Sequence, residues 1–327
     1  MIAGAAPPRA RRGREGDAAV LLARFVHASD LHLGAPPEAN FALAAARRRQ
    51  LLAEVADVRP DWLVLSGDLT HHGSVRPEEL QASRTELEGL GIPYNTVAGN
   101  HDLCPSPEEA ANFPGIEVYE PGPLGATVWG RTFGAEGVHF RHRLGPVEFL
   151  GVSLRGGDPD GELGWLTEAL GRPAPGARAR VVVGHYPVRP VRGEGPLKTW
   201  GPGHLGTAAQ ALGRVLADAA QGPVPVVAYL FGHVHVLAAE LAQGVWHATP
   251  GAVGAGCPGY RVGEIWEDRI ELRFVPLGIA ELAECRFWSA GNPSACADEL
   301  HPDYQSYHGG NAAERALTIP LPVRTPG

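Results

Sequence analysis

The sequence predicts an α/β fold in which buried strands alternate with amphipathic helices. Two observations indicate it. Short apolar runs alternate with stretches of helical spacing along most of the 327 residues, and five of these runs stop at a small residue that precedes Asp, Asn or His. Glycine (43 residues) and proline (30 residues) are abundant but follow no period, which excludes collagen-like and repeat architectures.

The composition is that of a soluble globular protein, with 44% apolar and 20% charged residues. The net charge of −8 disfavours a broad nucleic-acid surface, since such binding neutralises phosphates with Lys and Arg. This charge leaves room for a small basic groove that binds nucleic acid. The chain has no apolar run of about 18 residues, so we expect no membrane span and a cytoplasmic protein.

The first strand is predicted at residues 24–29. It follows a tail over residues 1–22 that is rich in Ala, Pro and Arg and is expected to be disordered. The apolar stretch 18–26 runs directly into a motif, which indicates a strand and not a signal-peptide core. We expect a catalytic domain over residues 23–278.

Helices and strands alternate after the first strand. Two helices are predicted at 38–58 and 77–90, the second with Pro77 near its start, and two strands at 62–66 and 94–98. Residues 103–138 are rich in Pro and Gly and predict a substrate-facing insertion, with one strand-like piece at 126–129.

The remaining elements continue this pattern up to residue 274. Further strands are predicted at 147–152, 180–183 and 224–231, helices at 162–170 and 207–220, and consecutive antiparallel strands at 245–248, 260–266 and 269–274. Residues 279–327 have little periodicity and are predicted to form a C-terminal extension of unknown role.

The four cysteines are scattered, without a C-x-x-C pair. Cys285 and Cys296 could form a disulfide or a weak metal site, but free thiols in a cytosolic protein are the preferred interpretation.

Five strand ends carry side chains of the types that bind metals in proteins. They are Asp30-Leu31-His32, Gly67-Asp68, Gly99-Asn100-His101-Asp102, Gly184-His185 and Gly232-His233-Val234-His235. An α/β fold collects its site in the crevice beyond its strand ends, so we expect these side chains to meet there. The glycines are expected to let the chain turn tightly while the next side chain enters the site.

The chemical types suit a centre of two metal ions. Carboxylate and amide oxygens with imidazole nitrogens favour Mn or Fe, with Zn as a further candidate. Asp68 has two oxygens and is expected to bridge ions about 3.5–4 Å apart, where a bridging water becomes a hydroxide nucleophile for in-line attack on phosphorus. His101 is predicted to act beside the metals on the transition-state oxygens or the leaving group, and Asp102 to orient it.

These motifs, in this order, resemble the calcineurin-like metallophosphoesterase superfamily over about residues 25–274. The resemblance implies a four-layer αββα sandwich of two mixed β-sheets flanked by helices. It also implies a first metal held by Asp30, His32, Asp68 and His235, and a second held by Asp68, Asn100, His185 and His233. His101 is the implied catalytic histidine, and Asn100 and His101 the implied substrate-binding residues.

Other polar residues have simpler interpretations. His27 is predicted to be structural. His71 and His72 could line the substrate rim, but loop histidines facing solvent are the preferred interpretation. The run Arg47-Arg48-Arg49 predicts a solvated helix face and not a phosphate-binding patch.

Two resemblances compete for the substrate. Residues 244–250 and 258–261, together with the Trp165-Leu166 helix, resemble class III cyclic-nucleotide phosphodiesterases and their broad-specificity relatives. Residues 27–34 resemble the first motif of metal-dependent DNA-repair exonucleases. We expect hydrolysis of small phosphodiesters; the alternatives are a nuclease, a phosphomonoesterase or protein phosphatase, and a non-enzymatic scaffold. Fold alone does not decide among them.

Overall fold

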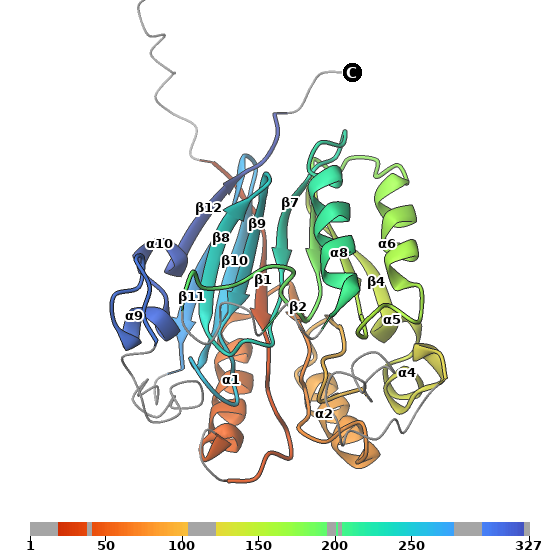
Figure 1. Ribbon diagram of the computed structural model, residues 1–327, viewed down its shortest axis with the longest axis vertical. Helices are drawn as coiled ribbons and strands as arrows, with labels where there is room; N and C mark the ends of the chain where they lie inside the picture. The colour runs from red at the N-terminus through yellow and green to blue at the C-terminus, as the bar shows by residue number, and fades with distance from the viewer. Residues whose placement is uncertain are drawn as a thin grey trace, which may run out of the picture.

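The computed structural model describes residues 19–37, 41–103, 122–194, 201, 205–277 and 296–323. Two six-stranded mixed sheets form the centre of this part of the chain (Figure 1). The predicted α/β sandwich of two mixed sheets is therefore confirmed.

The first sheet has the order β12-β11-β10-β1-β2-β3. Strands β1, β2 and β3 run parallel, whereas β10, β11 and β12 pair antiparallel. Its strands are β1 (Leu21–Ala28), β2 (Trp62–Leu65), β3 (Tyr94–Thr96), β10 (Gly259–Trp266), β11 (Arg269–Pro276) and β12 (Ala316–Pro320).

The second sheet has the order β4-β5-β6-β7-β9-β8. Strands β5, β6, β7 and β9 are parallel, and β4 and β8 close the two edges in antiparallel fashion. Its strands are β4 (His139–Leu144), β5 (Val147–Val152), β6 (Ala179–Val183), β7 (Val226–Leu230), β8 (Leu237–Ala242) and β9 (Val245–Pro250).

Helices cover the outer faces of the sheets. The described helices are α1 (Ala44–Val58), α2 (Pro77–Gly89), η2 (Leu124–Ala126), α4 (Val128–Phe133), α5 (Ala135–Val138), α6 (Glu162–Gly171), α8 (Thr207–Ala219), α9 (Tyr304–Gly309) and α10 (Ala312–Arg315). None of the helices within the described ranges is long and apolar enough to cross a membrane.

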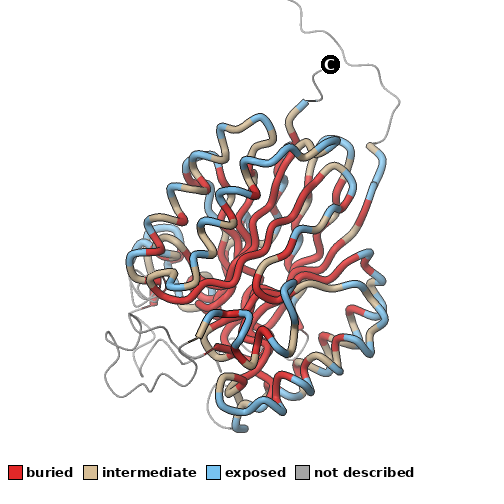
Figure 2. The backbone as a smooth tube through the Cα atoms, turned by 90° about the vertical axis from the view of Figure 1, so that its right-hand side faces the viewer, coloured by how far each residue is buried: buried red, intermediate tan, exposed pale blue. Residues whose placement is uncertain are grey.

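Three apolar cores separate these layers. One lies between the sheets, where Phe25 of β1 and Trp62 of β2 pack with Phe149 of β5. The second holds α6 and α8 against the second sheet, and the third holds α1 and α2 against the first. Figure 2 shows the strands as the buried interior and the helix surfaces as the exposed exterior.

Several sequence predictions need correction. The strand predicted at 126–129 is the end of η2 and the start of α4, whose first turn Thr127 caps by accepting from Gly130 N. The strands predicted at 245–248 and 260–266 are not neighbours, because β9 belongs to the second sheet and β10 to the first. Arg47 is buried and does not belong to a solvated face.

The chain ends also differ from expectation. Strand β1 begins at Leu21, inside the segment assigned to the tail, and residues 1–18 lie outside the described ones. The segment of unknown role after residue 278 supplies α9, α10 and β12, so it completes the first sheet. Cys257 and Cys296 are buried free thiols, while Cys285 lies outside the described residues.

Candidate metal centre

The five predicted motifs lie at the carboxyl ends of parallel strands. Three follow β1, β2 and β3 of the first sheet, and two follow β6 and β7 of the second. Both sheets direct these ends to the same side of the sandwich, and loops of the two sheets contact each other: His233 N donates to the carboxylate of Asp30 (3.1–3.2 Å), and His185 Nδ1 lies 2.7 Å from Ser66 O. Loops from both sheets therefore meet at this side, where the site was expected.

The backbone of these loops is unusual. Five expected ligands have positive φ values between 49° and 70°, a region that non-glycine residues adopt rarely and mainly at functional sites. They are Asp30, His32, Asp68, His233 and His235. Cross-loop bonds fix this geometry; for example, His32 N donates to Asp68 O at 3.1 Å. The strain is thus concentrated at the residues whose side chains converge.

A first cluster combines Asp30, His32, Asp68 and His235. One donor atom from each lies within 4.8 Å of the others, and all four residues are buried. His235 Nε2 is 3.1 Å from His32 Nε2 and 3.2 Å from Asp30 Oδ1. The structure brings together the four residues expected at the first metal.

A second cluster combines Asp68, His185 and His233. His185 Nε2 is 3.3 Å from Asp68 Oδ2 and 3.2 Å from Asn100 Oδ1. His185 Nδ1 lies 2.7 Å from Ser66 O, a carbonyl that can only accept, so Nδ1 donates to it and Nε2 faces the cluster. Asp68 belongs to both clusters, as a bridging carboxylate would.

These distances fit bound cations. Ligands about 2.1 Å from one ion lie about 3.0–3.4 Å from each other, and the contacts around His235 and His185 are 3.1–3.3 Å. Imidazole nitrogens with carboxylate and amide oxygens suit Mn, Fe or Zn and do not discriminate among them. The residues present therefore fit a centre of two ions.

Ionisation agrees with this conclusion at Asp68 and His32 but not at His185. Burial opposes the charge of His185, but Asp68 outweighs it and raises the pKa of His185 to about 9, so this imidazole must lose a proton before it can bind a metal. Burial opposes the charge on Asp68, but His185, His101 and His32 outweigh it and hold the pKa of its carboxyl well below the usual value. Burial, together with the charge of His101, lowers the pKa of His32 well below the usual range, so its imidazole is neutral. An ionised carboxylate and a neutral imidazole are the forms that bind metals.

Among the glycines of the motifs, only one has the backbone conformation expected of a tight turn. Only Gly67 has a positive φ, of 94°. A Cβ atom at Gly99 would overlap Asp68 Oδ1, and one at Gly232 would overlap Ser29 Oγ and crowd Asp30. Gly99 and Gly232 are therefore required by close packing of the ligands and not by a tight turn.

His101 lies beside the first cluster. Its ring centroid is 4.9 Å from that of His32, and its backbone N donates to Asp68 Oδ1 at 2.8 Å. His101 Nδ1 donates to the carbonyl of His71 at 2.9 Å, which leaves Nε2 as the second functional nitrogen.

Asp102 does not orient His101, contrary to the sequence prediction. Its buried carboxylate accepts from the backbone N–H groups of Leu69, Thr70 and Gly99 and from the Thr70 hydroxyl, over 2.7–3.1 Å. Through these bonds the carboxylate joins the loop after β2 to the loop after β3. The expected catalytic partnership is therefore replaced by a structural one.

His71, for which a solvent-facing loop position was preferred, is half-buried at the centre. Its ring stacks on His101, with centroids 4.8 Å apart, and its Nδ1 is 3.4 Å from His32 Nδ1. Phe41 packs edge-on against both His71 (4.6 Å) and His32 (4.9 Å). His72, in contrast, turns away and pairs with Glu79. The sequence offered no signal to separate these two histidines, since both simply follow a Gly-Asp loop.

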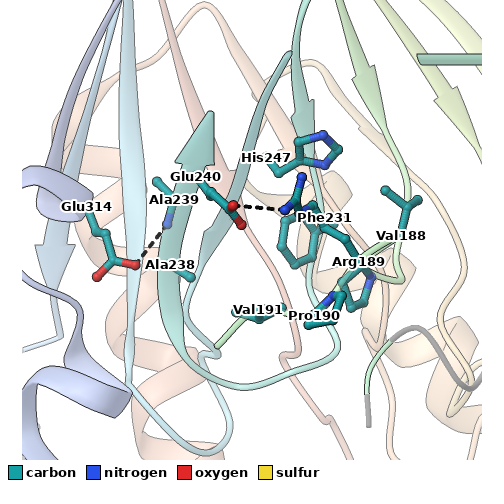
Figure 3. A pocket seen from close by; sticks show the side chains of 11 residues that line it. Val188, Arg189, Pro190, Val191, Phe231, Ala238, Ala239, Glu240, His247 and Glu314 are labelled. Carbon is teal, nitrogen blue, oxygen red and sulfur yellow. Dashed lines mark hydrogen bonds and ion pairs between the residues drawn. The ribbon is translucent and has the colours of Figure 1, made fainter. Parts of the chain in front are cut away.

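His247, within the segment that resembles cyclic-nucleotide phosphodiesterases, lies outside both clusters. Figure 3 shows it on the wall of a small apolar cavity with Phe231 and Pro190, beside the ion pair between Arg189 and Glu240. His27 is buried and its Nε2 bonds to Ser66 Oγ at 2.8 Å, in agreement with a structural role.

Comparisons with known proteins agree with this centre. Residues 23–237 match the family model described as calcineurin-like phosphoesterase. A probable cyclic nucleotide phosphodiesterase from a Synechococcus species is 36% identical over 89 residues, which are 27% of this chain and 33% of that protein. The match thus spans about a third of that relative's length.

Solved structures share the fold at low sequence identity. A dimetal phosphatase from Danio rerio gives a TM-score of 0.57 at 14% identity and covers 79% of this chain and 97% of its own. The anchor protein GAP50 from the inner membrane complex of Plasmodium gives 0.50 at 17% identity, covering 80% and 87%. At such identities the likeness establishes the architecture alone.

Proposed function

Because the chain belongs to the calcineurin-like phosphoesterase family and is a metal-dependent phosphoric ester hydrolase, we propose that it acts as a two-metal phosphodiesterase on small phosphodiesters. The observation that carries this proposal is the pair of donor clusters that share Asp68. When bound, two ions would supply polarisation of the phosphoryl group and activation of a water molecule.

The residues of the chain would hold the two ions, donate a proton and position the phosphoryl group. Asp30, His32 and His235 would hold the first ion, while Asn100, His185 and His233 would hold the second, with Asp68 common to both. His101 would use Nε2 to donate to a phosphoryl oxygen or to the departing alkoxide, because its Nδ1 is engaged by a carbonyl. Asn100 would help to position the phosphoryl group beside it.

Two observations support a diester over a monoester. The relative with 36% identity is described as a probable cyclic nucleotide phosphodiesterase. Aromatic rings also flank the clusters: Phe41 beside His32 and Tyr186 beside His233, with ring centroids 4.9 Å and 4.8 Å apart. A diester carries two organic groups, and the partly exposed ring of Phe41 offers one of them contact surface, whereas Tyr186 is buried.

The alternative functions, a nuclease or a scaffold, require other features of the protein. A nuclease needs a surface that follows a charged backbone, whereas this chain carries a net charge of −8. A scaffold needs no convergent ligands, yet strained backbone holds five of them in place. The GAP50 neighbour is described as an anchor, so for this chain the clusters, and not the fold, support catalysis.

The proposal is tested on protein that has been stripped of metal and reloaded with Mn²⁺. We expect bis-p-nitrophenyl phosphate to be hydrolysed faster than p-nitrophenyl phosphate, and cyclic nucleotides faster than linear DNA or phosphopeptides. Asp68→Asn serves as the control that removes the bridging charge. Preference for the monoester, or degradation of DNA without activity on small diesters, would replace the proposed substrate class.

A further inference from the structure

His71 contacts both the first donor cluster and His101. Its side chain meets His32, its backbone carbonyl accepts from His101, and its ring stacks on the His101 ring at an interplanar angle of 24°. Its own backbone is fixed, because His71 N donates to Leu33 O at 2.8 Å. One residue therefore touches a proposed ligand and the proposed catalytic group.

The two nitrogens of His32 face different neighbours. Nε2 points into the first cluster, 3.1 Å from His235 Nε2, whereas Nδ1 points to His71 Nδ1 at 3.4 Å. To bind a cation, Nε2 must present a lone pair, so the proton of a neutral His32 must lie on Nδ1. His71 Nδ1 is then the acceptor of that proton.

We infer that His71 is a positioning residue, whose Nδ1 fixes the tautomer and ring orientation of His32 for the first metal. The inference rests on the proposed two-metal centre. Metal-bound histidines usually donate their other N–H to a carboxylate, a carbonyl or water. His185 follows that rule by donating to Ser66 O, whereas His32 uses a second imidazole.

Packing holds this acceptor in place. Phe41 lies edge-on to both rings, with centroids 4.6 Å from His71 and 4.9 Å from His32, and His101 covers a face of His71. A ring fixed on two sides can hold an acceptor at a defined angle, which a solvated loop histidine cannot. The Nδ1 acceptor for His32 and the carbonyl that accepts from His101 both belong to His71, so the relative position of these two groups is fixed.

The test replaces the acceptor and measures metal affinity, not activity. His71→Leu removes it, whereas His71→Asn places an amide oxygen near the position of Nδ1. We expect His71→Leu to weaken binding of one of two Mn²⁺ ions by about 10–100-fold, as loss of such partners does elsewhere. Occupancy at saturating Mn²⁺ stays at two ions, and His71→Asn recovers most of the affinity. Chelator competition gives the affinities, and Co²⁺ absorption reports the ligand geometry.

Controls make the result specific. His72→Leu removes the neighbouring histidine, which pairs with Glu79, and is expected to leave both affinities unchanged. If His71→Leu does not fold, as judged by circular dichroism, His71→Gln replaces it in the test. Its amide oxygen reaches the position of Nε2 and not that of Nδ1, so the same loss of Mn²⁺ affinity is expected. Wild-type affinity in His71→Leu, or an equal loss in His71→Asn, overturns the inference. Binding of fewer than two Mn²⁺ ions by the wild-type protein would overturn both this inference and the proposed function.

Discussion

His32 and His235 face each other through their Nε2 atoms, which lie 3.1 Å apart although 203 residues separate them in the sequence. Both side chains are buried, and the carboxylate of Asp30 completes the group at 3.2 Å from His235. Two imidazole lone pairs directed at one point are stabilised best by a cation between them. The folded state should therefore depend on metal.

Chelation is expected to lower the melting temperature. A ligand at 100 times its dissociation constant adds about 2.7 kcal/mol to the free energy of unfolding, which corresponds to roughly 5 °C or more for a domain of this size. Differential scanning calorimetry in EDTA and in Mn²⁺ measures the shift. His235→Ala is the control and should respond less to Mn²⁺. Equal melting temperatures in both buffers would contradict a bound metal centre.

His101→Ala is expected to lower kcat on bis-p-nitrophenyl phosphate by about 10²–10⁴-fold, the usual contribution of a positioned acid or base. Its metal content should stay at the wild-type level, since His101 lies beside the clusters and its Nδ1 is bonded to His71 O. Steady-state kinetics with elemental analysis of the same sample separates the two effects. Unchanged turnover would remove His101 from the reaction.

Gly99→Ala is expected to weaken metal binding, because the new Cβ would overlap Asp68 Oδ1. Displacement of the shared carboxylate affects both ions, and overpacking should cost about 1–3 kcal/mol of stability. Gly89→Ala is the matched control: it lies exposed at the end of α2 with no atom within 4 Å of an added Cβ. Urea unfolding should find it stabilised by at most about 1 kcal/mol. Equal metal affinity in both variants would argue against close packing at Gly99.

Glu314 is expected to make stability fall in acid. Burial opposes its charge, but hydrogen bonding to His301 and the charge of Arg192 lower its pKa to about 2. A lowered pKa stabilises the fold above the unfolded value of 4.5, and this contribution is lost as the pH falls from 4.5 towards 2. The difference corresponds to about 3 kcal/mol.

Urea unfolding between pH 3 and pH 7 tests this dependence. Glu314→Gln should be less stable than the wild type at pH 7 and should show a weaker loss in acid, because the variant cannot take up that proton. Glu299→Gln changes an exposed residue of the same segment and should follow the wild-type curve. A wild-type slope in Glu314→Gln would assign the acid sensitivity to other groups.

The inner strands were predictable from sequence, whereas three of the four edge strands were not. Inner strands such as β2 (WLVL) are buried along their whole length and form continuous apolar runs. The missed strands β4, β8 and β12 are all sheet edges, where one side has no neighbour and charged or helix-favouring residues are tolerated. Strand β3 is also an edge, but the Gly-Asn-His-Asp motif after it revealed it.

The residues of the two donor clusters were predictable because each motif follows the carboxyl end of a strand. What the sequence could not provide was the contact between loops: Asp102 bonds to the loop after β2, and His71 lies against His101 and His32. Such contacts depend on how neighbouring loops face each other, and positive φ values occur in the loops after β1 and β2 but not in residues 97–103 after β3. Neither periodicity nor spacing encodes that relation.

The position of β1 between β2 and β10 also has a consequence for synthesis of the protein. Ribosomes add roughly 5–20 residues per second, so His235 emerges about 10–40 s after His32, from which it is 203 residues away. Until residue 185 is added, the nascent chain holds only Asp30, His32, Asp68 and Asn100 of the proposed ligands; His185 follows, and His233 and His235 come last. Both proposed metal sites are thus complete only once His233 and His235 have been added, shortly before the chain reaches β10, the second neighbour of β1.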